Sequence, residues 1–468
     1  MNLKKNKSYI VPFDIWSAMD LRGLVSTDDY IWMPYPPDVT AKELAAFSDR
    51  WAGAHSILEN CSRPREVDPI GSEFDLIHEI VNDYYSYNLI DRSIKSIKFL
   101  FSDNQKVMFD VARYFMSEIK RYGIEEIISF STPHQWESYL LMRVAKRLGV
   151  KFRIIERSAI AHRYWITSNY SPLRKLSADK FDPNNISERT ASLIKQLRGD
   201  LESPLNFVQF QQEVYGANQY NISSEVKKGI YNFLHARFFK LIMQFIKYKL
   251  HKQYLKYSKK LGDKDRFEKV VTFFLSYQPE KTTLPEAGIF FHQELLIRTL
   301  AHAVPEGCEV LVREHPSTFL MEYEVGGRRL DFYQRISEIR NVRLDDMSRG
   351  VNEVIDSSDV VATCTGKVGF QAVLRGVPCL TFGSSQYNDM PYVSAYSNYE
   401  SLVKNLHKYI NCPPQMDERE IMKYLAAVEH FSVEEQPIIN ISSRRKQRIE
   451  AMIATLLDSE KRGFSSAL

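Results

Sequence analysis

The strongest constraint on the fold is a repeated alternation of apolar strand-like runs and amphipathic helical runs between about residues 265 and 410. KVVTFFLSY predicts a strand and FFHQELLIRTLAHAV a helix, and CEVLVREHP and FYQRISEI repeat the pair. The alternation continues through NVRLDD, VNEVIDSS, DVVATCTG, KVGFQAVLRG and VPCLTFG. Connections of about 2–6 residues between such elements are typical of a doubly wound sheet. We therefore predict parallel strands flanked by helices.

A second region, up to about residue 215, shows the same alternation. Apolar residues on one face of residues 105–121 predict an amphipathic helix that Gly123 ends, and IEEIISF predicts a short buried strand. STPHQWESYLLMRVAKRLGV predicts the next helix, with Ser131 or Thr132 as its N-cap and Pro133 at its first position. KFRIIE predicts the next strand. Helix–strand–helix–strand at this spacing indicates a second parallel α/β domain.

Length and composition narrow the class of protein. At roughly 150 residues per domain, 468 residues predict two or three domains. The chain has 62 Lys and Arg against 58 Asp and Glu, so its charge balance does not indicate a nucleic-acid binder. Its five cysteines form neither a disulfide framework nor a metal-binding pattern. The chain has no signal-peptide pattern at its N-terminus and no apolar stretch of about 18 residues, so we expect a cytoplasmic protein.

Between the two α/β regions lies an unusually basic segment. Residues 226–261 contain ten Lys or Arg, two His and no acidic residue, interleaved with apolar and aromatic side chains. One interpretation is a linker helix with one face packed on a domain and the other in solvent. A compatible interpretation is a surface that rests on anionic lipid, and nucleic acid is a third. The predicted organisation is an α/β domain at 1–215, a basic helical linker at 216–264, an α/β domain at 265–410 and C-terminal helices at 411–468 that cross back.

Polar motifs follow three of the predicted strands of the second α/β region. They are Ser276–Thr283, Arg313–Ser317 and Thr363–Phe370. Ligands of doubly wound sheets bind at the carboxyl ends of the strands, so we expect these motifs to converge on one site.

The third motif has the composition of an anion site. Small hydroxyl residues and glycines where a helix begins, here Thr363, Thr365 and Gly366, offer unpaired N–H groups and close approach, which suits phosphate. The alternative is that the two threonines only cap the helix. The spacing matches neither a Walker A loop nor GxGxxG. His315, preceded by Arg-Glu and followed by Pro316, is a candidate donor to the same phosphate.

The three motifs in this order resemble the C-terminal domain of bacterial capsule and surface-polysaccharide glycosyltransferases of the GT-B type, including the Kdo-transferase and sialyltransferase-like groups. The resemblance covers about residues 270–390. It implies that an HP dipeptide and a hydroxyl-rich turn hold a nucleotide phosphate. The matching positions are His315 and Pro316 with the neighbouring Ser317, then Thr363, Thr365 and Gly366, and, in the QPE.TT segment, Gln278, Glu280 and Thr282.

A weaker resemblance covers residues 124–167. The run from Glu156 to Thr167 looks like the E.GylRPdyiT segment of capsule-biosynthesis proteins. It departs from that pattern at Ser158 and at Ala161-His162-Arg163.

These resemblances imply two doubly wound Rossmann-type domains facing a cleft, in a GT-B-like α/β fold. The implied activity is transfer of a sugar in capsule or lipopolysaccharide O-antigen assembly. The preferred donor is a Kdo-like ulosonic acid linked to CMP, and the acceptor is a glycan or a lipid-linked glycan. Alternatives are a UDP-GlcNAc 2-epimerase-like enzyme, a polyol-phosphate transferase, or a non-catalytic scaffold in polysaccharide assembly. We expect peripheral attachment to the inner face of the inner membrane.

Glycosyl transfer needs a carboxylate near the anomeric carbon. Glu156, at the end of the KFRII strand, is the first candidate, followed by Glu137 and Asp14, and His134 is a further candidate. His315 is predicted to act on the leaving phosphate. No DxD pair follows a strand, so neither a metal nor a separate cofactor is expected.

Overall fold

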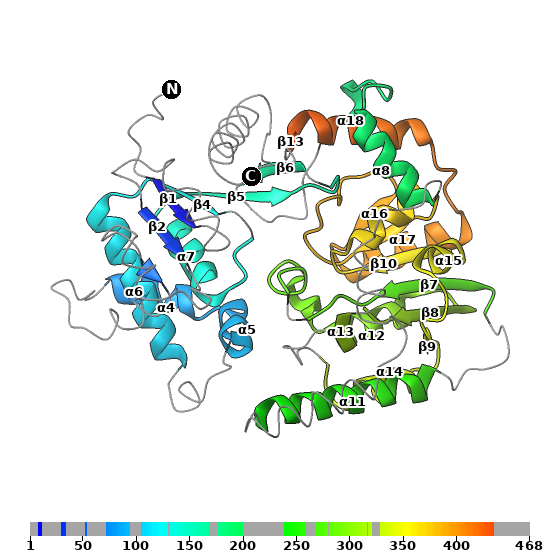
Figure 1. Cartoon of the computed structure of the whole chain (residues 1–468), viewed down its shortest axis with the longest axis horizontal. Helices are drawn as coiled ribbons and strands as arrows, with labels where there is room; N and C mark the ends of the chain where they lie inside the picture. The colour runs from blue at the N-terminus through cyan, green and yellow to red at the C-terminus, as the bar shows by residue number, and fades with distance from the viewer. Residues whose placement is uncertain are drawn as a thin grey trace. The chain divides into compact units, whose positions relative to one another are not determined.

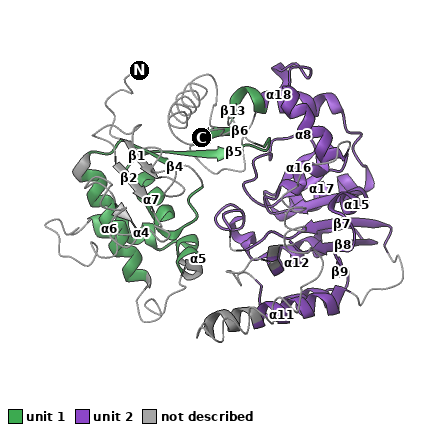
Figure 2. Ribbon diagram, in the orientation of Figure 1, with its two compact units in different colours: residues 1–171, 428–468 green, residues 172–427 purple. Residues whose placement is uncertain are grey.

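The chain forms two compact units, which are described separately (Figure 2). Unit 1 comprises residues 1–171 and 428–468, and unit 2 comprises residues 172–427. The computed structural model describes residues 8–11, 30–33, 52–53, 72–93, 104–129, 132–161, 163–167, 176, 178–199, 238–258, 267–278, 280–315, 317–320 and 328–434.

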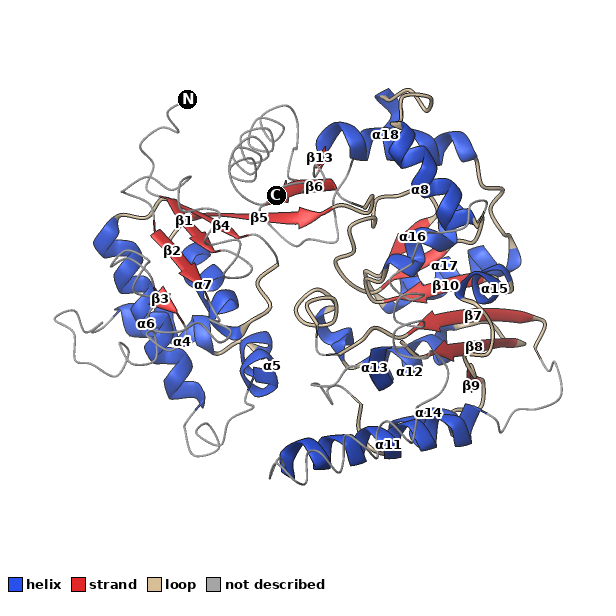
Figure 3. Cartoon of the chain, in the orientation of Figure 1, coloured by secondary structure: helices blue, strands red, loops and turns tan. Residues whose placement is uncertain are grey.

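Unit 2 is built on a six-stranded sheet in which every described pair of neighbours is parallel (Figure 3). The strands are β7 (Lys269–Phe274), β8 (Cys308–Arg313), β9 (Val342–Leu344), β10 (Val360–Thr363), β11 (Cys379–Thr381) and β12 (Val393–Ala395). Their order is β12-β11-β10-β7-β8-β9. Counted from β7 along the chain, this is the 3-2-1-4-5-6 order of a dinucleotide-binding fold, whose direction reverses between β7 and β10.

Helices cover both faces of this sheet because its strands are apolar on both faces. In β10, Val360 and Ala362 pack into one core cluster and Val361 into another. The first cluster includes side chains of α12 (Gln293–Ala303), α14 (Phe332–Ser337) and α17 (Tyr399–Asn411). The second includes side chains of α15 (Val351–Asp356) and α16 (Lys367–Leu374). Burial of both faces is typical of parallel sheets.

The remaining elements of unit 2 lie before the sheet or connect its strands. They are η2 (Ala178–Lys180), α8 (Glu188–Arg198), α11 (Phe238–Ser258), η4 (Gly288–Phe291) and α13 (Ser317–Leu320), and α18 (Glu418–Phe431) crosses from unit 2 into unit 1.

Helix α11 lies along the β9 edge of unit 2, next to α14 (Figure 1). Leu250, Tyr254 and Tyr257 are buried in the core of the unit. The Tyr254 hydroxyl donates to the Asp345 carbonyl, while Phe245 is 59% exposed. Over residues 238–258, one face of the helix therefore packs on unit 2, to which the helix belongs, and the other meets solvent.

Unit 1 is built on a seven-stranded sheet in the order β13-β6-β5-β4-β1-β2-β3. Its parallel strands are β1 (Ser8–Val11), β2 (Tyr30–Met33), β3 (Ala52–Gly53), β4 (Glu126–Ser129) and β5 (Lys151–Arg157). Strand β6 (Arg163–Thr167) is antiparallel to β5, and β13 (Val433–Glu434) is antiparallel to β6. The helices are α4 (Ser72–Val81), α5 (Tyr84–Ser93), α6 (Asn104–Tyr122) and α7 (Trp136–Arg147).

The predicted α/β class is confirmed, since each unit is organised around a mainly parallel sheet with helices. The helix predicted at 105–121 is α6, and the two strands predicted after it are β4 and β5. The predicted cap of α7 is wrong. That helix begins at Trp136, its N-cap is Gln135, and the Thr132 hydroxyl instead donates to Glu156.

The division into units differs from the domain boundaries predicted at residues 215 and 411. It falls after Ser171 and again after Ala427. Helix α8 belongs to unit 2 because it packs on α16, where Arg198 Nε donates to the Leu374 carbonyl at 3.0 Å. The chain returns to unit 1 through β13, beside which Arg163 Nη2 donates to the Ser432 carbonyl at 3.0 Å.

We predict that Gly369→Ala destabilises unit 2 by about 1–3 kcal/mol. In an open helix this change would stabilise by about 1 kcal/mol, but here the added Cβ would lie 2.5 Å from Cys379 Sγ and still closer to the Tyr387 hydroxyl. Urea denaturation measures the free energy of unfolding. Tyr387→Phe removes the nearer atom, so the double variant should recover part of the loss. A Gly369→Ala protein as stable as the wild type would contradict the close packing.

Candidate functional site

The motifs after β7 and β10 meet at the point where the strand order of unit 2 reverses. Phe274 and Thr363, the last residues of the two strands, lie side by side in register. Beyond them, the Thr365 hydroxyl donates to the Thr282 carbonyl at 2.9 Å. In doubly wound sheets this crevice is where ligands bind. The structure therefore brings two of the three predicted motifs into direct contact.

The turn between β10 and α16 is built by its own threonines. Thr363 Oγ1 accepts from the Gly366 N–H at 3.2 Å, and a Cβ at Gly366 would lie 2.8 Å from that oxygen. Both threonines are buried, and neither caps α16: the N-cap is Gly366, without a side-chain cap hydrogen bond, and the alternative interpretation of the two threonines as caps is therefore wrong. The N–H groups where a helix begins are in general donors to an anion, and α16 begins here, at Lys367. In its first turn the Gly369 N–H already donates to the Gly366 carbonyl at 3.2 Å.

Cys364 lies between these two threonines and is fully buried. Burial raises the pKa of its thiol to about 12. The thiol is therefore protonated at neutral pH and has no nucleophilic role.

His315 follows β8, the strand beside β7. The ring is half-buried, with its centroid 6.0 Å from that of Tyr277. Burial lowers the pKa of His315, and this outweighs the opposing effect of the Glu314 carboxylate. At neutral pH the imidazole is therefore neutral, with one N–H donor and one acceptor nitrogen. Pro316 lies outside the described residues, as does the Ser317 side chain, although the Ser317 backbone begins α13.

Glu314, the residue before His315, forms a fully buried ion pair with Arg328, here called the Glu314–Arg328 clamp. Arg328 Nε donates to Glu314 Oε2 at 2.9 Å, and Arg328 Nη2 donates to Oε1 at 3.0 Å. Glu314 Oε1 also accepts the backbone N–H of His315 at 2.7 Å. Burial would raise the pKa of the Glu314 carboxyl, but Arg328 beside it holds that pKa below its ordinary value.

The clamp also fixes the end of β7. Arg328 Nη1 donates to Gln278 Oε1 at 2.7 Å, and Nη2 donates to the Ser276 carbonyl at 2.9 Å. The other end of the Gln278 amide donates to the Phe291 carbonyl at 2.6 Å. Gln278, predicted to bind the nucleotide, is thus bonded to protein groups at both ends of its amide.

The other two residues of the QPE.TT segment lie at the rim of the same site. Glu280 is exposed, and its carboxylate accepts from the Thr282 hydroxyl at 3.2 Å. Lys281 forms an ion pair with Glu286 at 3.2 Å. The carbonyl of Glu286 accepts the Ser384 N–H at 2.7 Å, which joins the loop after β11 to this loop.

No sequence motif marks Arg328 as part of the site. In the printed sequence it stands beside Arg329 in a run without any motif, yet Arg328 is buried in the clamp while the Arg329 side chain is 74% exposed. Only the approach of residues distant in the chain distinguishes the two arginines.

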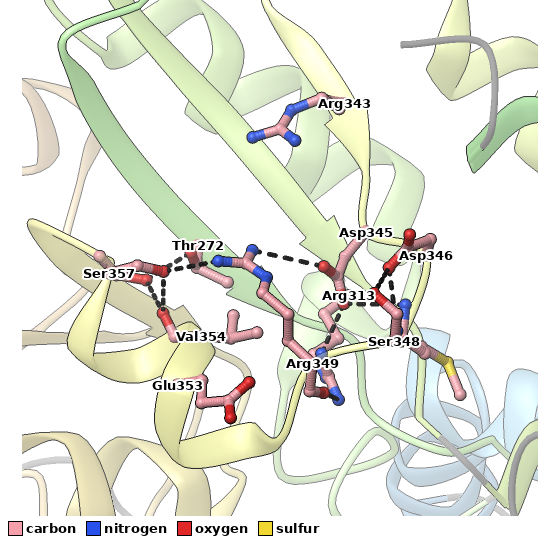
Figure 4. A network of polar contacts seen from close by, with 12 residues as sticks. Thr272, Arg313, Arg343, Asp345, Asp346, Ser348, Arg349, Glu353, Val354 and Ser357 are labelled. Carbon is pink, nitrogen blue, oxygen red and sulfur yellow. Dashed lines mark hydrogen bonds and ion pairs between the residues drawn. The ribbon is translucent and has the colours of Figure 1, made fainter. Parts of the chain in front are cut away.

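A second polar network fixes the ends of β8 and β9 (Figure 4). Arg313 Nη1 donates to Asp345 Oδ2 at 2.5 Å, and Arg313 Nη2 donates to the Arg349 carbonyl at 2.8 Å. The Arg349 side chain turns to Ser357, where Nη1 donates to Oγ at 3.1 Å. Arg313 and Glu314, adjacent at the end of β8, therefore each form a buried ion pair with a different partner.

The carboxylates proposed from the sequence lie in unit 1. Glu156, near the end of β5, is buried and accepts from the Thr132 hydroxyl, which follows β4. His134 Nδ1 lies 2.9 Å from the Thr132 carbonyl. The structure thus brings Glu156, Thr132 and His134 together at the ends of neighbouring strands. Asp14 lies outside the described residues.

Glu137, in the first turn of α7, is also buried, and its Oε2 has no hydrogen-bond partner. Burial raises the pKa of Glu137 to about 8, although its own backbone N–H opposes the shift. At neutral pH it is therefore mainly a neutral acid, suited to donate rather than accept a proton.

No protein-family model matches the chain, and no curated protein matches it. Among solved structures, it is similar to the KpsC beta Kdo 2,7 transferase of Thermosulfurimonas dismutans, with 10% identity over 80% of this chain and 97% of that one and a TM-score of 0.31. The UDP-GlcNAc 2-epimerase of Methanocaldococcus jannaschii has 10% identity over 90% and 99% of the chains and a TM-score of 0.25. A glycosyltransferase of Rickettsia africae has 10% identity over 98% and 100% and a TM-score of 0.25. Because these identities and TM-scores are low, we assign the fold from the strand order of the two sheets in this chain.

The described residues contain neither a membrane-spanning helix nor a cluster of metal ligands. No helix there combines the length and apolar character needed to cross a bilayer. Within the same residues, no group of three or more His, Cys, Asp and Glu side chains could hold a metal ion.

We predict that Glu137→Gln becomes stabilising as pH rises. A carboxyl with a raised pKa keeps its proton in the folded state while the unfolded chain ionises, so wild-type stability falls between about pH 4.5 and pH 8. Glutamine stays neutral throughout. The variant should gain about 2–4 kcal/mol on the wild type between pH 5 and pH 8, measured by urea denaturation.

Glu125→Gln, at an exposed position of unit 1, is the matched control and should show no such gain. A stability difference between Glu137→Gln and wild type that is the same at both pH values would show that Glu137 ionises normally.

Proposed function

We propose that this chain is a nucleotide-sugar-dependent glycosyltransferase of bacterial surface-polysaccharide assembly. The observation that supports this most strongly is that the polar ends of β7 and β10 meet where the strand order of unit 2 reverses, with the polar end of β8 next to that of β7. The first turn of α16 supplies backbone N–H donors there, and His315 supplies a neutral imidazole. Such donors suit the phosphate of a nucleotide sugar.

The reaction breaks the bond between the anomeric carbon of the donor and a phosphate oxygen, and the acceptor hydroxyl oxygen forms a new bond to that carbon. Negative charge develops on the departing nucleotide phosphate. Donors placed around that phosphate stabilise the charge as it grows, which lowers the barrier. We assign this role to His315 and to the first N–H groups of α16.

The acceptor hydroxyl loses a proton in the same step, which requires a base. We assign the acceptor side to unit 1 and propose Glu156 as that base, since it lies near the carboxyl end of β5. Glu137, which is mainly protonated at neutral pH, suits a role as acid better. The two units would then act as the two domains of a GT-B-type enzyme.

For the donor we propose a Kdo-like ulosonic acid linked to CMP, which rests on the resemblance of the three motifs. Three other functions are compatible with the same sheet: a UDP-GlcNAc 2-epimerase-like activity, a polyol-phosphate transferase activity and a non-catalytic scaffold. Nucleotide binding separates the first and the last of these from the proposed function.

We predict that His315→Ala lowers turnover by on the order of 100-fold while leaving the fold intact, because a donor to the leaving phosphate is lost. Turnover is measured as CMP release from CMP-Kdo. The control is His302→Ala, at an exposed histidine of α12. Wild-type turnover in a folded His315→Ala protein would remove His315 from the site.

Thermal unfolding with added nucleotide tests the donor on the same proteins. CMP should stabilise the wild type more than UDP does, since a ligand that binds only the folded state raises its melting temperature. Stabilisation by UDP alone would favour the epimerase-like alternative. No response to either nucleotide would favour the scaffold.

We also propose that α11 attaches the enzyme to the inner face of the inner membrane, where lipid-linked acceptors would lie. Lys249, Lys252 and Lys256 are exposed on this helix, together with Phe245. Each basic residue near an anionic surface contributes about 1 kcal/mol, so the attachment would be reversible.

We predict that Lys249→Glu/Lys252→Glu reduces co-sedimentation with phosphatidylglycerol vesicles, and that added salt weakens wild-type binding because it screens the attraction. Lys404→Glu/Lys408→Glu, on exposed positions of α17, makes the same charge change and should bind as the wild type does. Equal losses in the two variants, or equal wild-type binding to neutral vesicles, would leave α11 only its packing role.

A further inference from the structure

We infer that Arg328 is a positioning residue for His315, because the Glu314–Arg328 clamp sets where the histidine stands relative to the loop after β7. The inference rests on the proposed role of His315 in phosphate binding. It concerns a residue to which the sequence motifs assign no part.

The Glu314 carboxylate fixes the backbone of His315 through a direct hydrogen bond. Its Oε1 accepts the His315 backbone N–H at 2.7 Å, so any rotation of the carboxylate breaks or moves that bond. The hydroxyl of Tyr333 holds the other oxygen at 2.6 Å, and the hydroxyl of Thr318 lies 3.1 Å from Oε1. With both oxygens bonded, the carboxylate has one orientation, and the backbone at His315 follows it.

Arg328 is the group that joins this carboxylate to the neighbouring strand end. Its planar guanidinium binds Glu314 through two nitrogens and uses two further N–H donors on Gln278 and on the Ser276 carbonyl. One rigid group therefore spans the ends of β7 and β8. A lysine ammonium keeps the charge but cannot reproduce a fork of this geometry.

The guanidinium is itself held in place from α14. Its carbon lies 5.0 Å from the centroid of the Phe332 ring, and the neighbouring Tyr333 donates to Glu314. Both members of the pair are fully buried, at 2% and 0% side-chain exposure. Solvent therefore cannot replace a bond that is lost within the clamp, so we expect the Glu314 carboxylate to move and the backbone at His315 to move with it.

Arg328→Lys, with Arg329→Lys as the matched control, tests the inference. The control makes the same substitution at the adjacent, exposed arginine. The first readout is the Cε1–Hε1 NMR signal of His315 in ¹³C-histidine-labelled protein without nucleotide, assigned by its absence in His315→Ala. We expect Arg328→Lys to shift this signal and Arg329→Lys to leave it at the wild-type position.

The second readout is CMP affinity, which we expect to fall on the order of tenfold in Arg328→Lys and to stay unchanged in Arg329→Lys. A folded Arg328→Lys protein with the wild-type His315 signal would overturn the inference. The NMR readout needs no nucleotide, so a protein that binds neither CMP nor UDP would refute the proposed function and still test the clamp.

Glu314→Gln provides a second test if Arg328→Lys does not fold. The carboxylate opposes the lowering of the His315 pKa, so its removal should lower that pKa further, as followed by the same NMR signal. An unchanged His315 signal and pKa in folded Glu314→Gln would likewise overturn the inference.

Discussion

The arrangement of the site in unit 2 depends on one buried ion pair. Burying two charges costs several kcal/mol per ion, and this cost is offset only where the remaining donors and acceptors are also satisfied. In the Glu314–Arg328 clamp they are satisfied by the Tyr333 hydroxyl, by backbone groups and by Gln278. Removal of one partner would leave the other charged and unpaired, which typically costs about 3–5 kcal/mol. The ends of β7 and β8 are therefore fixed together.

The same pair connects the site to the edge of unit 2. Tyr333 donates to Glu314 and packs its ring 5.2 Å from that of Tyr254 on α11. The Tyr254 hydroxyl in turn donates to the carbonyl of Asp345, whose carboxylate pairs with Arg313. The basic helix is thus anchored by aromatic packing and hydrogen bonds that belong to the ends of the strands. With Leu250, Tyr254 and Tyr257 buried, Lys249, Lys252 and Lys256 lie on the exposed part of the helix.

Much of the fold was predictable from the printed sequence because parallel strands buried on both faces must be apolar along their whole length. KVVTFF is a short, mostly apolar run, which is typical of a buried strand, and the sequence of α6 places its apolar residues on one helical face. The cap of α7 was not predictable, since Thr132 could bond locally or to a distant partner. Glu156, which lies 24 residues further along the chain, decided the outcome.

For the candidate site, too, some features were predictable from the sequence and others were not. The residue types after β7, β8 and β10 determine that the strand ends are polar and that α16 begins in a turn of threonine and glycine, because those side chains act locally. Tertiary structure alone decided what each side chain bonds. Gln278 faces Arg328 and Phe291, and Thr365 faces Thr282. Two adjacent arginines, Arg328 and Arg329, have the same chemistry in the sequence and opposite surroundings in the fold. The physical reason is that burial and hydrogen bonding depend on segments that only the folded chain brings together.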